Sequence, residues 1–252
     1  MKKPYFSFRQ RLVGILFIIT ASYFFYLYID EPTKPKWRYA EFTIEEFQKY
    51  YMKPEHALTL YQMMKDTHEI LVKHNINYWI DSGTLLGAVR HHGLIHYDDD
   101  LDICIMHEDE LRLQDILHEF ADIGYKVNHH FIYHIMPKDT EYPILDIFIC
   151  RRIDDKITYA HIAARHKFPN YFFYEEELFP LKMYDFGQIK VTGPNNPLPL
   201  LDRYYRDWDQ YAVIWNQHAV GRPAGVEMTK VKLIKEFLVP AEPQEPLKNR
   251  VK

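Results

Sequence analysis

The stretch YWIDSGTLLGAVRHHGLIHYDDDLDICI, residues 78–105, constrains this chain more than any other part of it. A turn of small residues at 82–84 precedes a dense run of carboxylates: Asp98, Asp99, Asp100 and Asp102. The run leads directly into apolar residues that predict a buried strand over 101–106. Carboxylates this close repel one another, so a chain rarely carries them into an apolar segment without a cation that neutralises them. The alternative for such a cluster is a solvated acidic turn.

The ligand chemistry of this cluster indicates a hard cation. Oxygen ligands without an accompanying cysteine or histidine pattern suit Mg²⁺ or Mn²⁺ better than Zn²⁺. Asp100 and Asp102 face the same side of their predicted strand, because side chains alternate along a strand. Asp146 is the single carboxylate of an apolar run over 144–149, and a buried aspartate needs a partner. We therefore expect Asp146 to meet the first pair from a neighbouring strand, and metal-assisted chemistry on a phosphate.

The turn before the aspartates has the features of an anion site. A short strand over 78–80 leads into Asp81 and the turn Ser82-Gly83-Thr84, and residues 85–90 are expected to be helical. The backbone N–H groups of the turn would then lie at a helix N-terminus, which favours anions such as phosphate. Asp81 is either the N-cap of this helix or a hydrogen-bond partner behind the site.

Composition limits the classes of function. The chain has 252 residues, enough for one sizeable domain plus a tail or anchor, and 47% of them are hydrophobic, which fits a packed core. The net charge is −4 and no basic stripe is present, so no nucleic-acid partner is expected. Cys104 and Cys150 are too few for a disulfide scaffold. They either bridge two neighbouring strands or, as we favour, remain reduced thiols in the core.

The N-terminal segment predicts a membrane anchor. Basic residues over 1–11 precede an uncharged apolar run over 12–29, which is long enough to span a bilayer. The basic flank predicts a cytoplasmic N-terminus and a catalytic body outside the cytosol. A cleaved signal peptide is the alternative, but the apolar run continues past the small residues at 20–22, which favours a retained signal-anchor. Residues 30–53 are interpreted as a stem.

Periodicity predicts the remaining organisation. We expect a domain over 54–220 and a C-terminal tail over 221–252 that is partly disordered and mobile from Pro240 onwards. Helices are predicted from Thr43 (a capping box with Glu46), over 54–74, over 108–123 and over 198–215. Strands are predicted over 125–136, 144–149 and 186–191.

Three separated motifs resemble the LicD/fukutin family in the same order: DSGTLLGAVRHHGLIHYDDDLDI, then LDIF, then FG…GPNNPLPLLDRYYRDW. The resemblance implies an α/β (α+β) fold with a nucleotidyltransferase-like mixed sheet flanked by helices. It also implies transfer of a phospho-alcohol or phospho-sugar, of the phosphocholine or ribitol-phosphate type, from a nucleotide-diphospho donor, CDP-linked, onto a glycan of a glycoprotein or envelope polysaccharide. Such a protein of a eukaryote would lie in the Golgi or the endoplasmic reticulum (ER) lumen.

The resemblance also implies roles for single residues. The catalytic carboxylates would be Asp98, Asp100, Asp102 and Asp146, and the ligands of Mg²⁺ or Mn²⁺ would be Asp100, Asp102 and Asp146. The donor phosphates would be held by Ser82, Gly83, Thr84, Gly87 and Arg90. Either Asp146 or Asp98 would accept the proton of the attacking hydroxyl. The chain departs from the family pattern at His96-Tyr97, where relatives have Pro-Trp, and at Arg206, where they have glycine.

A second class of function is compatible with the same residues. Some relatives act without catalysis, as membrane-anchored regulators of a glycosyltransferase or a mannosyl-phosphate transferase. Every expected carboxylate is present here, and a silent relative has no reason to keep acids that repel one another. The sequence therefore favours the enzyme.

Overall fold

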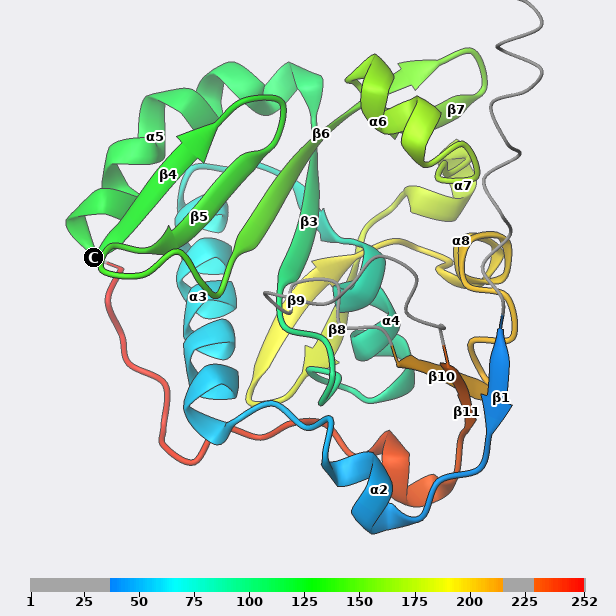
Figure 1. Cartoon of the computed structure of the whole chain (residues 1–252). Helices are drawn as coiled ribbons and strands as arrows, with labels where there is room; N and C mark the ends of the chain where they lie inside the picture. The colour runs from blue at the N-terminus through cyan, green and yellow to red at the C-terminus, as the bar shows by residue number, and fades with distance from the viewer. Residues whose placement is uncertain (1–36, 215–228, 252) are drawn as a thin grey trace, which may run out of the picture.

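The computed structural model describes residues 37–214 and 229–251. Its largest sheet has six strands in the order β2-β3-β6-β5-β4, with β7 also paired to β6 (Figure 1). The sheet is mixed, because β3 and β6 run parallel while the other neighbours are antiparallel. Its strands are β2 (Tyr78–Ile80), β3 (Leu101–Met106), β4 (Tyr125–His129), β5 (Tyr133–Pro137), β6 (Leu145–Ile153) and β7 (Lys156–Tyr159).

Two smaller sheets adjoin the large one. The hairpin of β8 (Lys182–Phe186) and β9 (Ile189–Gly193) packs beside β2. The other sheet has the order β1-β11-β10, formed by β1 (Arg38–Ala40), β10 (Tyr211–Ile214) and β11 (Thr229–Lys232). It therefore joins the beginning and the end of the described chain.

Helices surround the sheets, and α3 and α5 lie against one face of the large sheet (Figure 1). The α-helices are α2 (Ile44–Gln48), α3 (Pro54–Lys73), α4 (Ser82–Arg90), α5 (Glu110–Asp122), α6 (Ile162–Lys167), α7 (Glu175–Leu178) and α8 (Leu198–Tyr204). Two short 3₁₀ helices are η1 (His107–Asp109) and η2 (Lys235–Leu238).

The core lies around the central parallel pair of strands. Successive side chains of β3 and β6, which point to opposite faces of the sheet, are at most 9% exposed: Ile103 and Cys104 in β3, and Ile147 and Phe148 in β6. Burial on both faces is what a central strand of a mixed sheet requires, and it explains the near-continuous apolar run of each segment. The carboxylates at the start of each strand therefore sit on a rigid part of the molecule.

Most predicted elements are confirmed, including the mixed sheet with helices. The capping box of Thr43 and Glu46 opens α2. The strand predicted over 186–191 begins only at Ile189, because Phe186 ends β8 and a turn follows it. Two further predictions are wrong. Residues 125–136 form a hairpin, β4 and β5, rather than one strand. The helix predicted over 198–215 ends at Tyr204, because Asp207 adopts a positive φ of 62° and the chain then pairs as β10 with β11.

The predicted stem and tail are largely part of the folded body. Within the predicted stem, Phe47 is 0% exposed and stacks on Phe237 with ring centroids 3.8 Å apart. The Ala241 N–H donates to the Leu94 carbonyl at 2.9 Å. The Lys248 N–H donates to Gln62 Oε1 at 2.7 Å. The segment after Pro240, predicted to be mobile, is therefore fixed by main-chain hydrogen bonds that composition does not reveal.

Both cysteines lie in the core, and the predicted membrane span falls outside the described residues. Cys104 and Cys150 are both buried and free, as the sequence favoured, on the neighbouring strands β3 and β6. The predicted cytoplasmic segment 1–11 and the predicted span 12–29 lie outside the described residues. Within residues 37–214 and 229–251, no helix has the length and apolar character needed to cross a bilayer.

Candidate functional site

The small-residue turn and the acidic run form one site. Gly83 lies so close to Asp98 that a Cβ atom on the glycine would be 2.0 Å from Asp98 Oδ2. The Asp102 N–H donates to Thr84 Oγ1 at 2.8 Å, and the Asp81 N–H donates to the Asp102 carbonyl at 2.9 Å. The first turn of α4 is thereby tied to the start of β3, and only glycine at position 83 permits this approach.

The other small residues of the motif have separate tasks. Ser82 has a positive φ of 44°, which is uncommon for a residue with a side chain and is often found at functional sites. A Cβ on Gly87 would lie 2.5 Å from the Gly93 carbonyl oxygen. Gly87 therefore allows the loop that leads to the aspartates to pack closely against α4. In contrast, Ser82, Gly83 and Thr84 lie at the N-terminus of α4, where backbone N–H groups attract anions.

The expected meeting of carboxylates across two strands is present. Asp102 of β3 and Asp146 of β6 are direct partners in the parallel register. On the next strand, His134 of β5 lies opposite Asp146, with 2.6 Å between His134 Nδ1 and Asp146 Oδ1. This hydrogen bond raises the pKa of His134. Sequence reasoning missed His134, because its place beside Asp146 depends on a hairpin that was predicted as a single strand.

The electrostatics of the cluster fit a divalent cation. Burial, followed by the charge of Asp100, raises the pKa of Asp98 and of Asp102 well above the ordinary range. A bound cation would reverse this effect, and oxygen-only donors suit Mg²⁺ or Mn²⁺. In the two described ranges, no three His, Cys, Asp or Glu side chains converge as a ready-made metal cage. The fit therefore rests on donor chemistry and mutual repulsion.

Asp81 lies behind the turn. Asp81 occupies the N-cap position of α4, as one of the two alternatives expected, but its side chain makes no capping hydrogen bond to the helix. The carboxylate is 0% exposed and accepts hydrogen bonds on Oδ2 from Tyr159 Oη at 3.0 Å and Cys104 Sγ at 3.2 Å. Burial raises the pKa of Asp81. The residue lies behind the turn, and its charge is one of those that raise the pKa of Asp102.

Arg90 makes contacts that the sequence did not predict. Its Nη1 donates to the carbonyl oxygens of Trp208 at 2.6 Å and Tyr211 at 3.3 Å, and its Nη2 donates to Tyr97 Oη at 2.9 Å. The guanidinium thus links the end of α4 to the segment that enters β10. The charge of Arg90 still acts on the acidic cluster, because it lowers the pKa of Asp98 against the stronger effect of burial.

An Arg90→Lys variant should lose about 1.5–3 kcal/mol of unfolding free energy, because one ammonium cannot replace a guanidinium that binds three oxygens. Backbone amides of β10 should exchange faster with solvent. Denaturant unfolding and hydrogen exchange measure both effects. The control is Arg112→Lys, since this arginine is half-exposed on α5. If stability and exchange stay unchanged while transfer activity is lost, Arg90 acts on the donor phosphates instead.

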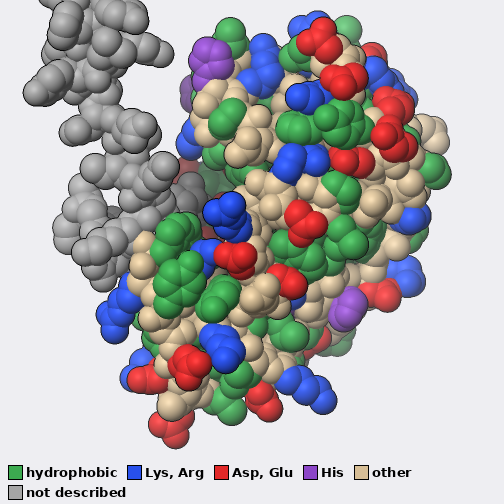
Figure 2. Space-filling view, turned by 90° about the vertical axis from the view of Figure 1, so that its right-hand side faces the viewer, with side chains coloured by type: hydrophobic (Ala, Val, Ile, Leu, Met, Phe, Trp, Pro, Cys, Tyr) green, Lys and Arg blue, Asp and Glu red, His purple; other side chains and the backbone are tan. Residues whose placement is uncertain are grey.

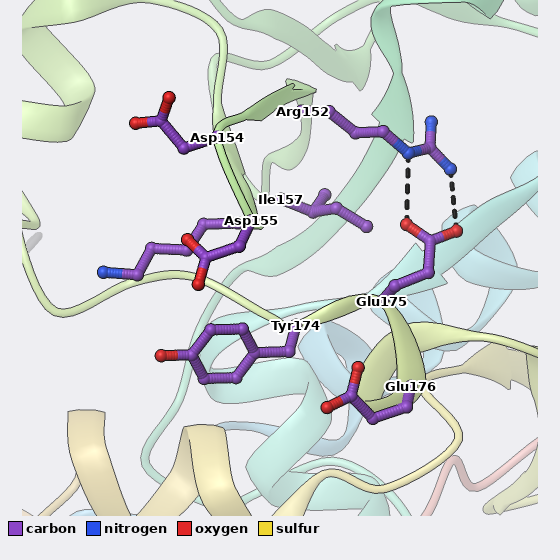
Figure 3. Close-up of a pocket in the computed structure, with 8 residues that line it drawn as sticks. Arg152, Asp154, Asp155, Ile157, Tyr174, Glu175 and Glu176 are labelled. Atoms are coloured by element: carbon purple, nitrogen blue, oxygen red, sulfur yellow. Dashed lines mark hydrogen bonds and ion pairs between the residues drawn. The ribbon is translucent and has the colours of Figure 1, made fainter.

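A cavity of about 620 Å³ lies away from these residues, between the β6–β7 hairpin and α7 (Figure 3). Arg152 closes one side by donating to both carboxylate oxygens of Glu175, at 3.1 and 2.9 Å. None of the predicted site residues lines it. Across the face seen in Figure 2, acidic, basic and hydrophobic side chains are interspersed, so this face carries no basic stripe of the kind that nucleic acid requires.

Comparison with known proteins identifies the family. Residues 75–196 match the family model described as LicD/FKTN/FKRP, nucleotidyltransferase domain. They contain the turn, the acidic run and Asp146. The chain belongs to the LicD/FKTN/FKRP family, and this membership indicates a transferase of a phosphate-containing group.

Individual relatives differ in how much of the chain they share. An uncharacterized protein of Rickettsia prowazekii is 47% identical over 245 residues, which cover 96% of this chain and 90% of the relative. The lipopolysaccharide cholinephosphotransferase LicD of Haemophilus influenzae is 33% identical over 75 residues, 30% of this chain and 26% of that protein. The solved structure of the lincosamide antibiotic adenylyltransferase LnuA with lincomycin has a TM-score of 0.38 at 21% identity, over 60% of this chain and 87% of that one.

These relatives correct the predicted localisation. The similar proteins that span nearly the whole chain come from Rickettsia, which are bacteria and have neither Golgi nor ER. The Golgi or ER lumen is therefore the wrong compartment. The accompanying prediction of a single-pass protein with an extracytosolic body is not supported either, since no helix of the described residues could cross a bilayer.

Proposed function

We propose that this protein transfers a phospho-alcohol or phospho-sugar from a nucleotide-diphospho donor, CDP-linked, onto a hydroxyl group of a glycan. The observation that carries the proposal is the contact of Gly83 with Asp98, which brings an anion-binding helix N-terminus against a cluster of carboxylates. Phosphates and a divalent cation are the groups that these two features bind. The partial match to a cholinephosphotransferase supports phosphocholine as one candidate group, with ribitol phosphate as the other.

In the proposed reaction each part of the site has its own task. The N–H groups at the start of α4 bind the donor phosphates. Asp100, Asp102 and Asp146 would hold Mg²⁺ or Mn²⁺, which when bound supplies positive charge beside the diphosphate. The acceptor hydroxyl attacks the outer phosphorus and the nucleoside monophosphate leaves from the opposite side. The hydroxyl proton passes to Asp98 or Asp146, as general-base chemistry requires a carboxylate within reach.

Thermal unfolding of the full chain tests the proposal. CDP with Mn²⁺ or Mg²⁺, at about a hundred times the dissociation constant, should add roughly 2.7 kcal/mol to the free energy of unfolding. We expect this shift in the wild type and in the control Asp122→Asn, which changes an exposed aspartate at the end of α5, and its loss in Asp100→Asn.

Other outcomes have defined meanings. A larger shift with GDP than with CDP would contradict the CDP-linked donor and favour a mannosyl-phosphate donor. An equal shift in Asp100→Asn would remove this residue from the cation site. If no nucleoside diphosphate stabilises the wild type, the catalytically silent regulator is the better description.

A further inference from the structure

A second cavity adjoins the acidic run. Its volume is about 810 Å³, and it lies between the start of α3, the loop before β3 and the loop after β5. Its lining includes Tyr50, Tyr51, Thr59, His96, Asp99 and Tyr142. The size is in the range of ligand pockets, about 300–1,000 Å³. Neither the resemblance nor the family match assigns a role to this cavity.

Consecutive aspartates connect the cavity to the donor turn. The Asp98 carboxylate packs on Gly83 of the turn, whereas Asp99 lines the cavity together with Tyr142. His56 Nε2 lies 3.2 Å from the Asp99 carbonyl oxygen and fixes the loop to α3. The acidic run therefore stands between the phosphate-binding turn and the cavity. In an in-line displacement the attacking and leaving groups occupy opposite sides of the phosphorus, so an acceptor must reach the acidic run from a place other than the one that holds the leaving nucleotide. The cavity beside Asp99 offers such a place.

The side chains that line the cavity indicate which kind of ligand it can bind. Tyr51 and His96 stack with ring centroids 3.6 Å apart and an interplanar angle of 7°, which makes a flat aromatic wall. A sugar ring can pack its apolar C–H face on such a wall, since aromatic rings offer a large apolar surface. The polar side chains of the lining include donors such as Lys53 and acceptors such as Glu55, which suits a ligand that carries several hydroxyl groups.

The charges of the lining side chains indicate whether the cavity suits a neutral or a charged ligand. Lys49 and Lys53 are balanced by Glu55 and Asp99, so the lining has no net charge when its histidines are neutral. A site built for an anion would carry an excess of positive charge. The balance therefore favours an uncharged ring with several hydroxyl groups over a nucleotide phosphate.

From these observations we infer that the cavity beside Asp99 is the acceptor subsite and binds an uncharged sugar ring, which presents its hydroxyl to the acidic cluster. This inference rests on the proposed function, since it needs donor phosphates at the turn. It adds the location of the acceptor, its lack of charge, and the side chains that select it: the Tyr51–His96 wall and Tyr50 at the rim.

Ligand-observed NMR by saturation transfer tests the inference with the full chain. The probes are the methyl glycosides of galactose, glucose and N-acetylglucosamine at millimolar concentration, with CDP and Mg²⁺ in parallel samples. At least one glycoside should receive saturation from the wild type. Thr59→Trp, which fills the cavity from α3, should remove that signal and leave the CDP signal unchanged. Tyr50→Ala should bind the glycoside roughly fivefold more weakly through loss of one aromatic contact.

The control variants distinguish loss of sugar binding from loss of the fold. Tyr50 is 39% exposed, so its substitution does not threaten the fold, and Tyr39→Ala removes a 59% exposed tyrosine that does not line the cavity. The inference is overturned if no glycoside binds the wild type, if glycoside binding survives Thr59→Trp, or if that variant loses CDP instead. If the wild type does not bind CDP, the proposed function is contradicted. A glycoside signal that disappears in Thr59→Trp would still place the sugar in this cavity.

Discussion

Gly83→Ala is expected to reduce transfer activity by a factor on the order of 10²–10³ and to leave the stability of the protein nearly unchanged. The added Cβ would lie 2.0 Å from Asp98 Oδ2 and 2.9 Å from its Cγ, so the carboxylate must move away from the turn. Misplacement of a reacting group by about 1 Å costs roughly 10²-fold in rate. The fold tolerates the change, because Gly83 is in the first turn of α4 and the added Cβ overlaps with the end of a side chain and not with backbone.

A double-mutant cycle shows whether the effect passes through Asp98. If Asp98→Ala alone and Gly83→Ala with Asp98→Ala have the same residual activity, the glycine acts only by giving room to that carboxylate. The measurements are transfer rate and denaturant unfolding for the three variants. Full activity in Gly83→Ala would show that neither Asp98 nor the turn has to hold its present position during the reaction.

For Asp102→Asn we expect opposite effects on stability and on activity. Burial, the charge of Asp100 and the charge of Asp146 raise the pKa of Asp102 well above the ordinary range. A carboxyl group whose pKa is raised by folding stabilises the protein at low pH and loses this contribution as pH rises through the folded-state pKa. In the presence of a chelator at pH 8, the asparagine variant should therefore unfold at a higher temperature than the wild type. This advantage should vanish as pH is lowered.

The same substitution should abolish transfer, by roughly 10³-fold or more, because charge stabilisation by a metal supplies several kcal/mol to such reactions. Added Mg²⁺ or Mn²⁺ should stabilise the wild type and not the variant. Thermal unfolding with and without cation, beside an activity assay, measures each part. The matched control is Asp122→Asn, which should follow the wild type throughout. A variant less stable than the wild type at pH 8 in chelator would show that Asp102 has a structural partner.

The local elements around the site could be predicted from the sequence, because each has its own pattern. The apolar strand before Asp81, the small-residue turn and the strand that begins at Leu101 form as expected. The meeting of Asp102 with Asp146 followed from a single buried carboxylate in need of a partner, and the parallel register of β3 and β6 provides it. Roles of these residues in binding metal and donor stay predictions.

Other features depend on pairing between distant segments, which periodicity does not report. His134 lies beside Asp146 only because residues 125–137 fold as a hairpin. Arg90 was interpreted as a phosphate ligand, since nothing local indicates that its partners are the carbonyl groups of Trp208 and Tyr211. Similarly, composition predicted a mobile tail after Pro240, but the contacts that fix it are made by Leu94 and Gln62, far away in the chain.

The pairing of β1 with β11 has a consequence for synthesis of the protein. Arg38–Ala40 is made long before its parallel partner Thr229–Lys232. Contacts this distant in sequence slow folding, and an unpaired strand edge invites association with other chains. Until the segment that carries β11 and Phe237 has emerged from the ribosome, β1 lacks its parallel partner and Phe47 lacks the ring on which it stacks. This interval is the one in which a chaperone is most useful to the nascent chain.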